Sequence, residues 1–147
     1  MRNLLKACKI TRVANSAVAG TTDVTSSVLD MAGFDGVIYV ALLGDVTVNS
    51  VLTLTAKENT ANSTSTPTPT SITGGATAAY TATATDSDNK ALVVDVNRPL
   101  RQFQFCILSR TAANAVVDGI IAIQYKAHLK PTVQDVSVLA QAFAVGS

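Results

Sequence analysis

Few side chains of this 147-residue sequence could carry out acid–base, nucleophilic or metal chemistry. Its one histidine, His128, lies between Lys126 and Lys130. A serine hydrolase would place the partner serine on a strained turn such as Gly-x-Ser-x-Gly, and that pattern does not occur. A zinc cluster would need several cysteines or histidines close together. We therefore predict that His128 is a strand residue at the rim of a sheet.

The two cysteines, Cys8 and Cys106, lie far apart in the sequence and have no third thiol beside them. Cys106 falls inside the run Gln104-Phe-Cys-Ile-Leu108, where a small core residue is the simplest interpretation. Cys8 lies in the leading segment and could be either buried or exposed. We expect both thiols to stay reduced in a cytoplasm, with a disulfide between them as the alternative.

The carboxylates form no recognised catalytic or calcium-binding pattern. Asp86-Ser-Asp-Asn89 resembles half of a calcium loop, but it lacks the glycine and the distal glutamate of an EF-hand. We predict a turn there, with a surface cation site as the alternative. Asp45, Asp95 and Asp118 could serve glycoside hydrolysis only if two of them flanked a sugar bond, and nothing in the sequence brings them together. We predict no enzyme activity, no catalytic residue, no metal and no cofactor.

Three arginines surround one predicted strand, over residues 101–109. On that strand Arg101, Phe103 and Phe105 point the same way, and such a set could stack single-stranded nucleic acid. The formal net charge is only +1, which gives a polyanion little attraction. We therefore favour phenylalanines in the core and arginines at the strand ends, with their stems on apolar surface or their charges paired with aspartates. Arg98 and Arg110 complete the set, and no nucleic-acid partner is predicted.

The composition is that of a folded chain, with 48% hydrophobic and 14% charged residues and no tryptophan. A chain of this length buries roughly 68–70% of its unfolded surface, so a core needs no disulfide. The first ten residues lack the apolar run of a signal peptide, and no stretch approaches 18 apolar residues. We expect synthesis in a cytoplasm, no export signal and no membrane partner.

The stretch Met31–Leu54 organises the fold. Val37–Leu43 is apolar throughout and suits a strand buried on both faces. Gly44-Asp45 is a turn signal, and the residues after it alternate between apolar and polar. The sequence thus predicts a long hairpin that ends near Lys57, with one face of its second strand turned to the core: Val48, Ser50, Leu52 and Leu54.

About eight segments are predicted as strands, separated by turn signals. The fold class is therefore all-β: an antiparallel β-sandwich, jelly-roll-like, with extended termini. One domain covers residues 1–147, with an N-terminal arm (1–9), an exposed Thr/Pro-rich loop (58–78) and a C-terminal tail (131–147). Gly119 is predicted as a bulge. The strands are expected over residues 10–13, 26–30, 37–43, 46–57, 79–85, 91–96, 101–109 and 116–129.

Three blocks of the sequence resemble small structural proteins of tailed bacteriophages, encoded near the major capsid protein and usually taken as head decoration (cement) proteins. The resemblance runs from about Ile10 to Pro131, with the blocks in the same order, and the Thr/Pro-rich loop is where such proteins are expected to vary most. The blocks are Thr22-Asp-Val-Thr-Ser-Ser-Val-Leu-Asp-Met-Ala-Gly-Phe-Asp-Gly-Val37, Asp88-Asn-Lys-Ala-Leu-Val-Val-Asp-Val-Asn-Arg-Pro99 and Asn114-Ala-Val-Val-Asp-Gly-Ile-Ile-Ala-Ile-Gln-Tyr125.

The resemblance implies a β-sandwich in the virion, on the capsid surface, that binds the outer face of an assembled icosahedral shell. Its partners would be the major capsid protein and its own copies, as a dimer or trimer; low surface charge also favours self-association. We expect the contacts to come from apolar residues of the arm and tail that lie outside the strand pattern: Leu4, Leu5, Ile10, Val133, Val136, Val138, Leu139 and Phe143.

Two other classes of protein stay open. A phage tail or fibre component could bind a receptor or a glycan through the exposed loop 58–78. A small hydrolase would need acid and base groups that converge in a polar pocket. The location of the protein on the virion separates the first alternative from cement, and a structure addresses the second.

Overall fold

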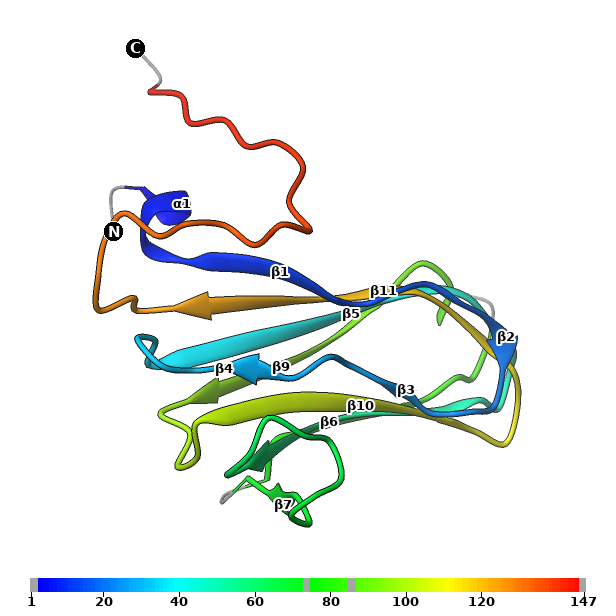
Figure 1. Ribbon diagram of the computed structural model, residues 1–147. Helices are drawn as coiled ribbons and strands as arrows, with labels where there is room; N and C mark the ends of the chain where they lie inside the picture. Colours follow the sequence, from blue (N-terminus) through cyan, green and yellow to red (C-terminus); the bar gives the residue numbers. More distant parts are fainter. Residues whose placement is uncertain (1–2, 73–74, 85–86, 146–147) are drawn as a thin grey trace.

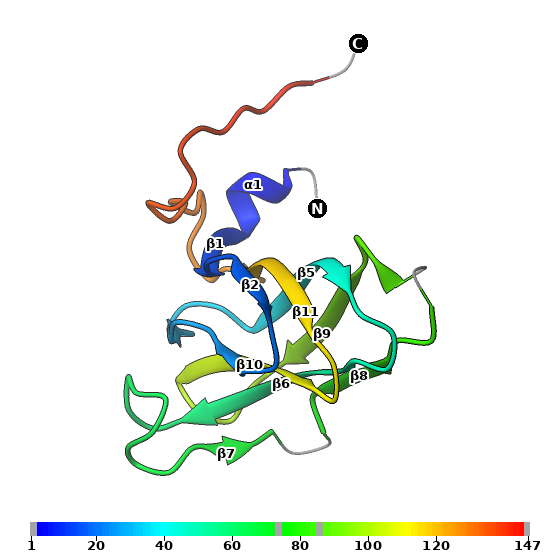
Figure 2. The same cartoon turned by 90° about the vertical axis from the view of Figure 1, so that its right-hand side faces the viewer.

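The computed structural model describes residues 3–72, 75–84 and 87–145, and in these residues the chain folds as two antiparallel sheets packed into a sandwich (Figures 1 and 2). One short helix, α1 (Leu4–Ala7), precedes the first strand. None of the described residues forms a helix with the length and apolar character needed to cross a membrane. The predicted fold class is confirmed.

Sheet A has five strands in the order β1-β11-β5-β9, with β2 also pairing with β11. Sheet B has six strands in the order β3-β10-β6-β7, with β4 beside β10 and β8 beside β6. The first and last strands are neighbours and the chain crosses repeatedly between the sheets, which is a jelly-roll arrangement. Sheet A comprises β1 (Lys9–Ala14), β2 (Ala17–Gly20), β5 (Gly36–Val46), β9 (Ala91–Asn97) and β11 (Ala115–Tyr125). Sheet B comprises β3 (Val24–Thr25), β4 (Leu29–Asp30), β6 (Val51–Asn59), β7 (Thr70–Ser71), β8 (Thr77–Thr81) and β10 (Phe103–Thr111).

The core lies between the two sheets, because alternate side chains of each long strand point inward. Tyr39 of β5, Leu54 of β6 and Ile120 of β11 are fully buried there. Cys106 of β10 belongs to the same cluster, so its prediction as a core residue is confirmed. Gly119 has a φ of +145° at an irregularity in the β11–β5 pairing, which confirms the predicted bulge.

The predicted central hairpin is wrong. β5 pairs with β11 and β9 in sheet A, whereas β6 pairs with β10 in sheet B, so the two strands face each other across the core. Gly44-Asp45 lies inside β5, and a Cβ on Gly44 would approach the Val116 side chain to 2.9 Å. This glycine therefore serves close packing beside the bulge, and the reversal occurs at Asn49, where φ is +70°.

The end of β11 also differs from the prediction. The strand stops at Tyr125, because Lys126 takes a φ of +51° and leaves the extended conformation. His128 consequently lies in the segment after the sheet and is not a strand residue. β9, predicted as buried, is an edge strand whose side chains alternate between exposed and buried.

Eleven strands are described where about eight were predicted. The additional ones are short strands of two to four residues, such as β2, and the predicted strand 26–30 is replaced by the pair β3 and β4. Segments this short present no hydrophobic period. In the loop 58–78, Glu58 and Asn59 are buried ends of β6, and the rest is mostly exposed. The predicted turn at Asp86–Asn89 lies partly outside the described residues.

Candidate functional site: an apolar surface formed by the two termini

The N-terminal arm and the C-terminal tail pack on each other beside β1 (Figure 1). The side-chain amide of Gln134 donates to the carbonyls of Leu5, at 2.9 Å, and Cys8, at 2.7 Å. The Gln134 carbonyl oxygen accepts from the backbone N–H of Ile10 at 2.6 Å. The Thr132 hydroxyl lies within 3.1 Å of the same two carbonyls. Polar side chains of the tail thus satisfy backbone groups of the arm.

The next part of the tail follows the free edge of β1. The hydroxyl of Ser137 accepts from the backbone N–H of Arg12 at 2.9 Å. Asp135 accepts from both the N–H and the hydroxyl of Ser137, and these bonds lower the pKa of Asp135. Edge strands leave unpaired backbone N–H groups that attract other strands. On β1, side chains of the tail accept hydrogen bonds from two of these groups.

Apolar side chains of the tail point the other way, into solvent. Val133 is 84% exposed, Val136 94% and Leu139 98%. Exposed apolar side chains that stand singly are ordinary, but a row of them on a segment held by its polar residues marks an interaction site. We call this the terminal surface; it consists of Leu4, Leu129, Val133, Val136, Leu139, Phe143 and Val145.

The predicted contact residues divide into two groups. Leu4, Val133, Val136, Leu139 and Phe143 are exposed. Three others are half-buried against their own chain: Leu5, Ile10 and Val138.

Sequence reasoning missed Leu129 and Val145, which are 86% and 82% exposed. It also missed the polar residues that hold the tail. The signal for them was the alternation of polar and apolar residues in Thr132-Val-Gln134. At the far end of the tail, the Lys6 ammonium lies 5.8 Å from the centre of the Phe143 ring, a cation–π contact.

His128 anchors the base of the tail. The ring Nε2 of His128 lies 2.6 Å from a carboxylate oxygen of Asp35. The backbone N–H of His128 donates to the carbonyl of Gly33 at 2.8 Å. The bond from His128 lowers the pKa of Asp35. Both side chains are exposed, so this pair fixes a loop at the surface.

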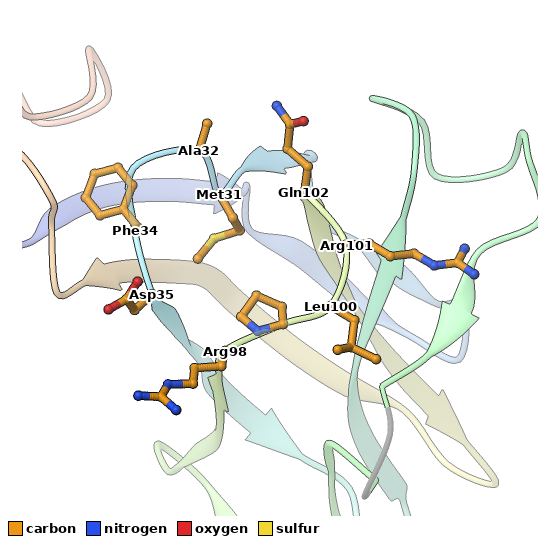
Figure 3. Close-up of a pocket in the computed structure, with 9 residues that line it drawn as sticks. Met31, Ala32, Phe34, Asp35, Arg98, Leu100, Arg101 and Gln102 are labelled. Atoms are coloured by element: carbon orange, nitrogen blue, oxygen red, sulfur yellow. The ribbon is translucent and has the colours of Figure 1, made fainter.

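A shallow groove lies at the same end of the sandwich, between the loops 31–35 and 98–102 (Figure 3). It has a volume of about 590 Å³, and Met31 and Pro99 are among the residues that line it. Arg98 and Arg101 point to opposite sides in Figure 3, so their charges do not converge on one ligand position. The groove therefore has the shape of a cleft without the arrangement of an anion site.

The third arginine lies at the far end of β10 and is buried. The Arg110 guanidinium, from sheet B, donates to the carbonyls of Val18 and Ala115 in sheet A and of Thr22 in the segment between β2 and β3. It closes that end of the sandwich. Phe105 is fully buried as well, so the stacking surface considered as an alternative for Arg101, Phe103 and Phe105 does not form. The prediction that Phe105 belongs to the core is wrong, because it lies on the outer side of β10, opposite Cys106.

The remaining candidates serve structure. Asp88 accepts from the N–H of Val46 at 2.8 Å, which ties the turn after residue 86 to β5. Asp95 accepts from the Tyr125 hydroxyl at 2.6 Å, and Asp45 and Asp118 flank the irregular pairing of β5 with β11. No group of three or more potential metal ligands occurs within the described ranges.

Both cysteines are free and buried. Burial raises the pKa of the Cys106 thiol to about 12 and also raises that of Cys8. Neither thiol is therefore ionised at neutral pH, so neither is an activated nucleophile.

Solved structures that are similar to this chain include two distant neighbours. No family model matches the sequence, and no curated protein matches it. A TNF, Eiger from S. frugiperda, is 10% identical with a TM-score of 0.37, over 86% of this chain and 91% of that chain. A family two carbohydrate esterase from Cellvibrio japonicus is 11% identical with a TM-score of 0.31, over 84% of this chain and 33% of that chain. The chain thus spans a third of the esterase's length, and likenesses this weak bear on neither activity nor partners.

Proposed function

We propose that this chain is a structural protein of a tailed-bacteriophage virion, a decoration (cement) protein that binds the outer surface of the head and stabilises the assembled shell. The observation that carries the proposal is the terminal surface, a row of apolar side chains held outward by polar residues on the same segment. The three sequence blocks that resemble head decoration proteins give the proposal its class of partner, the major capsid protein.

The mechanism is mechanical. A protein that binds the assembled shell better than its free subunits shifts the equilibrium toward the shell by mass action. Copies that each touch several subunits at fixed spacing add weak contacts through effective concentration. The tail is already held against the arm before binding, so less conformational entropy is lost when it meets its partner.

The experiment is co-sedimentation of the purified chain with matching phage heads, before and after shell expansion, followed by cryo-EM of the loaded heads. We expect saturable binding to expanded heads at a symmetric position. The double variant Val136→Asn/Leu139→Asn should bind at least about tenfold more weakly, because both side chains lose their apolar contacts. Both residues are over 90% exposed, so the fold should be unaffected.

Val18→Asn provides the matched control, because Val18 is 86% exposed on β2, away from the terminal surface. It should bind heads as the unaltered chain does. Absence of binding to either form of the head would overturn the proposal. Binding at the tail instead would favour a tail or fibre component that recognises a receptor or a glycan through the exposed loop 58–78.

A further inference from the structure

The outer face of sheet A carries aliphatic side chains from four neighbouring strands. Inward residues of β5 such as Tyr39 belong to the core, so Ile38, Val40 and Leu42 point outward. The strand register continues this pattern across the sheet in two rows. One row contains Ile10, Ile123 and Ile38, and the other contains Ile121, Val40 and Val93.

Little of the chain covers this face. Val93 is 53% exposed and Leu42 38%, and the other members of the rows are half-buried among themselves. The tail reaches only the β1 side, where Ser137 and Val138 border a hollow of about 250 Å³ over Ile121. Figure 2 shows α1 and the tail on that side. The face therefore meets the tail at one margin.

Such a face is unusual for a sheet that meets water. Antiparallel sheets with one solvated side normally alternate apolar and polar residues. On sheet B of the same chain, the outward positions of β6 at 53, 55 and 57 follow that rule with Thr, Thr and Lys, and the outward Phe105 of β10 is fully covered by the chain. A contiguous aliphatic patch on the other sheet marks a surface that packs against a protein.

We infer that the outer face of sheet A is a homotypic interface, through which two copies of this chain pack face to face. A two-fold axis parallel to the strands would set β1 of one copy over β9 of the other. The outward charge on β1 is Arg12, in the row of Ile121, and the outward charge on β9 is Asp95, in the row of Ile38. The two rows are about 7 Å apart along the strands. Each Arg12 would then approach Asp95 of the second copy, so the face is complementary to itself in charge.

The size of the face agrees with this arrangement. Four strands about 4.8 Å apart and five residues with a rise of about 3.3 Å make an area of roughly 320 Å². Ser137 and Val138 of the tail, which border the hollow over Ile121, extend it toward the roughly 800 Å² per partner of a standard interface. A net charge of +1 gives two copies almost no mutual repulsion.

The test is sedimentation equilibrium of the purified full chain without phage heads, so its outcome is independent of the proposed function. We expect twice the chain mass for the unaltered protein. Val40→Lys places a charge in the centre of the face and should raise the dimer dissociation constant at least about 100-fold. Val40→Thr keeps the shape and β-branching and should raise it about tenfold.

Thr53→Lys makes the same kind of change on the outer face of sheet B and should leave the dissociation constant within about twofold. Arg12→Glu should weaken the dimer, and Arg12→Glu/Asp95→Arg should restore it. Circular dichroism verifies the fold of each variant. A monomer at submillimolar concentration, or an oligomer that folded Val40→Lys and Val40→Thr leave intact, would overturn the inference.

Discussion

The outer faces of the two sheets carry different side chains, and the rest of the chain covers them to different extents. Sheet A presents Ile, Val and Leu and is covered only along its β1 side. Sheet B presents mainly Thr and Lys on β6, whereas β10 presents Phe103, Phe105 and Ile107, of which Phe105 is fully buried. Phe105 points away from the core, because its neighbours Gln104 and Cys106 point inward.

The cover of sheet B comes from its own chain. The segment after β6 folds back below sheet B in Figure 1. Asn59 holds it: its side-chain amide donates to the carbonyls of Ser63 and Pro67, and its carbonyl oxygen accepts from Thr60. The comparison teaches that an outward apolar residue is covered by the same chain on sheet B, whereas on sheet A the proposed second copy would cover it.

Truncation of Phe105 should show the largest effect. Phe105→Ala removes a fully buried ring, and we expect a loss of about 3–5 kcal/mol in the free energy of unfolding. Val93→Ala on the outer face of sheet A removes a side chain that is 53% exposed and should cost less than about 1 kcal/mol in the monomer. Urea denaturation at low protein concentration measures both values. Similar losses for the two variants would mean that the loop does not cover sheet B.

Removal of the anchor of the loop should be the next largest effect. Asn59→Ala leaves carbonyls and N–H groups of the loop without partners, and we expect a loss of about 1–3 kcal/mol together with exposure of Phe105. Asn62→Ala, at an exposed position of the same loop, is the control and should change stability by less than about 0.5 kcal/mol. Hydrogen exchange of β10 amides should speed up only in the first variant.

Alternation and turn chemistry made much of the fold predictable from the sequence. They located β1, β9, β10 and most of β11, and the inward face of β6. They could not tell which strands pair, because β5 and β6 are neighbours in sequence and lie in opposite sheets. Gly44 illustrates the ambiguity, since a glycine that permits close packing has the same appearance in a sequence as a glycine in a turn.

The candidate site was predictable in part. Apolar residues outside the strand pattern identified the tail, and their exposure agrees with that choice. The outer face of sheet A was not found, because an apolar run such as Val37–Leu43 suggests burial on both sides. Only the register shows that its alternate residues align with Ile121 and Ile123 on the outside. Phe105 was assigned to the core because nothing local shows that the outer side of β10 is covered as well.

The loss of stability at alkaline pH should distinguish changes on the inner face of β10, where Cys106 lies, from changes on its outer face. The pKa of Cys106 is raised from 9.0 to about 12 in the folded state. Between these values the folded chain keeps the thiol proton and the unfolded chain loses it. The stability contribution is therefore complete below pH 9 and is lost as the pH rises toward 12, by up to about 1.4 kcal/mol per pH unit.

Denaturant titrations at several alkaline pH values measure this slope. Cys106→Ala should flatten it without abolishing it, because burial also raises the pKa values of Cys8 and Tyr39. Asn59→Ala, which opens only the outer cover, should lower the whole curve and keep its slope. An unchanged slope in Cys106→Ala would show that the thiol does not report opening between the sheets.

The smallest effect is expected at the polar margin of sheet A. The Tyr125 ring lies across β5 at Gly36, where an added Cβ would come within 2.5 Å of ring atoms, and its hydroxyl donates to Asp95 of β9. Burial and the Asp95 carboxylate raise the pKa of Tyr125.

Asp95→Asn removes the negative charge, so the pKa of Tyr125 should fall toward its ordinary value while global stability stays nearly constant. Ultraviolet titration of the tyrosinate measures the shift, with Asp45→Asn as the matched control. If the pKa of Tyr125 does not move, burial alone raises it. The Tyr125–Asp95 hydrogen bond would then not be the polar contact that distinguishes the margin of sheet A from its aliphatic centre.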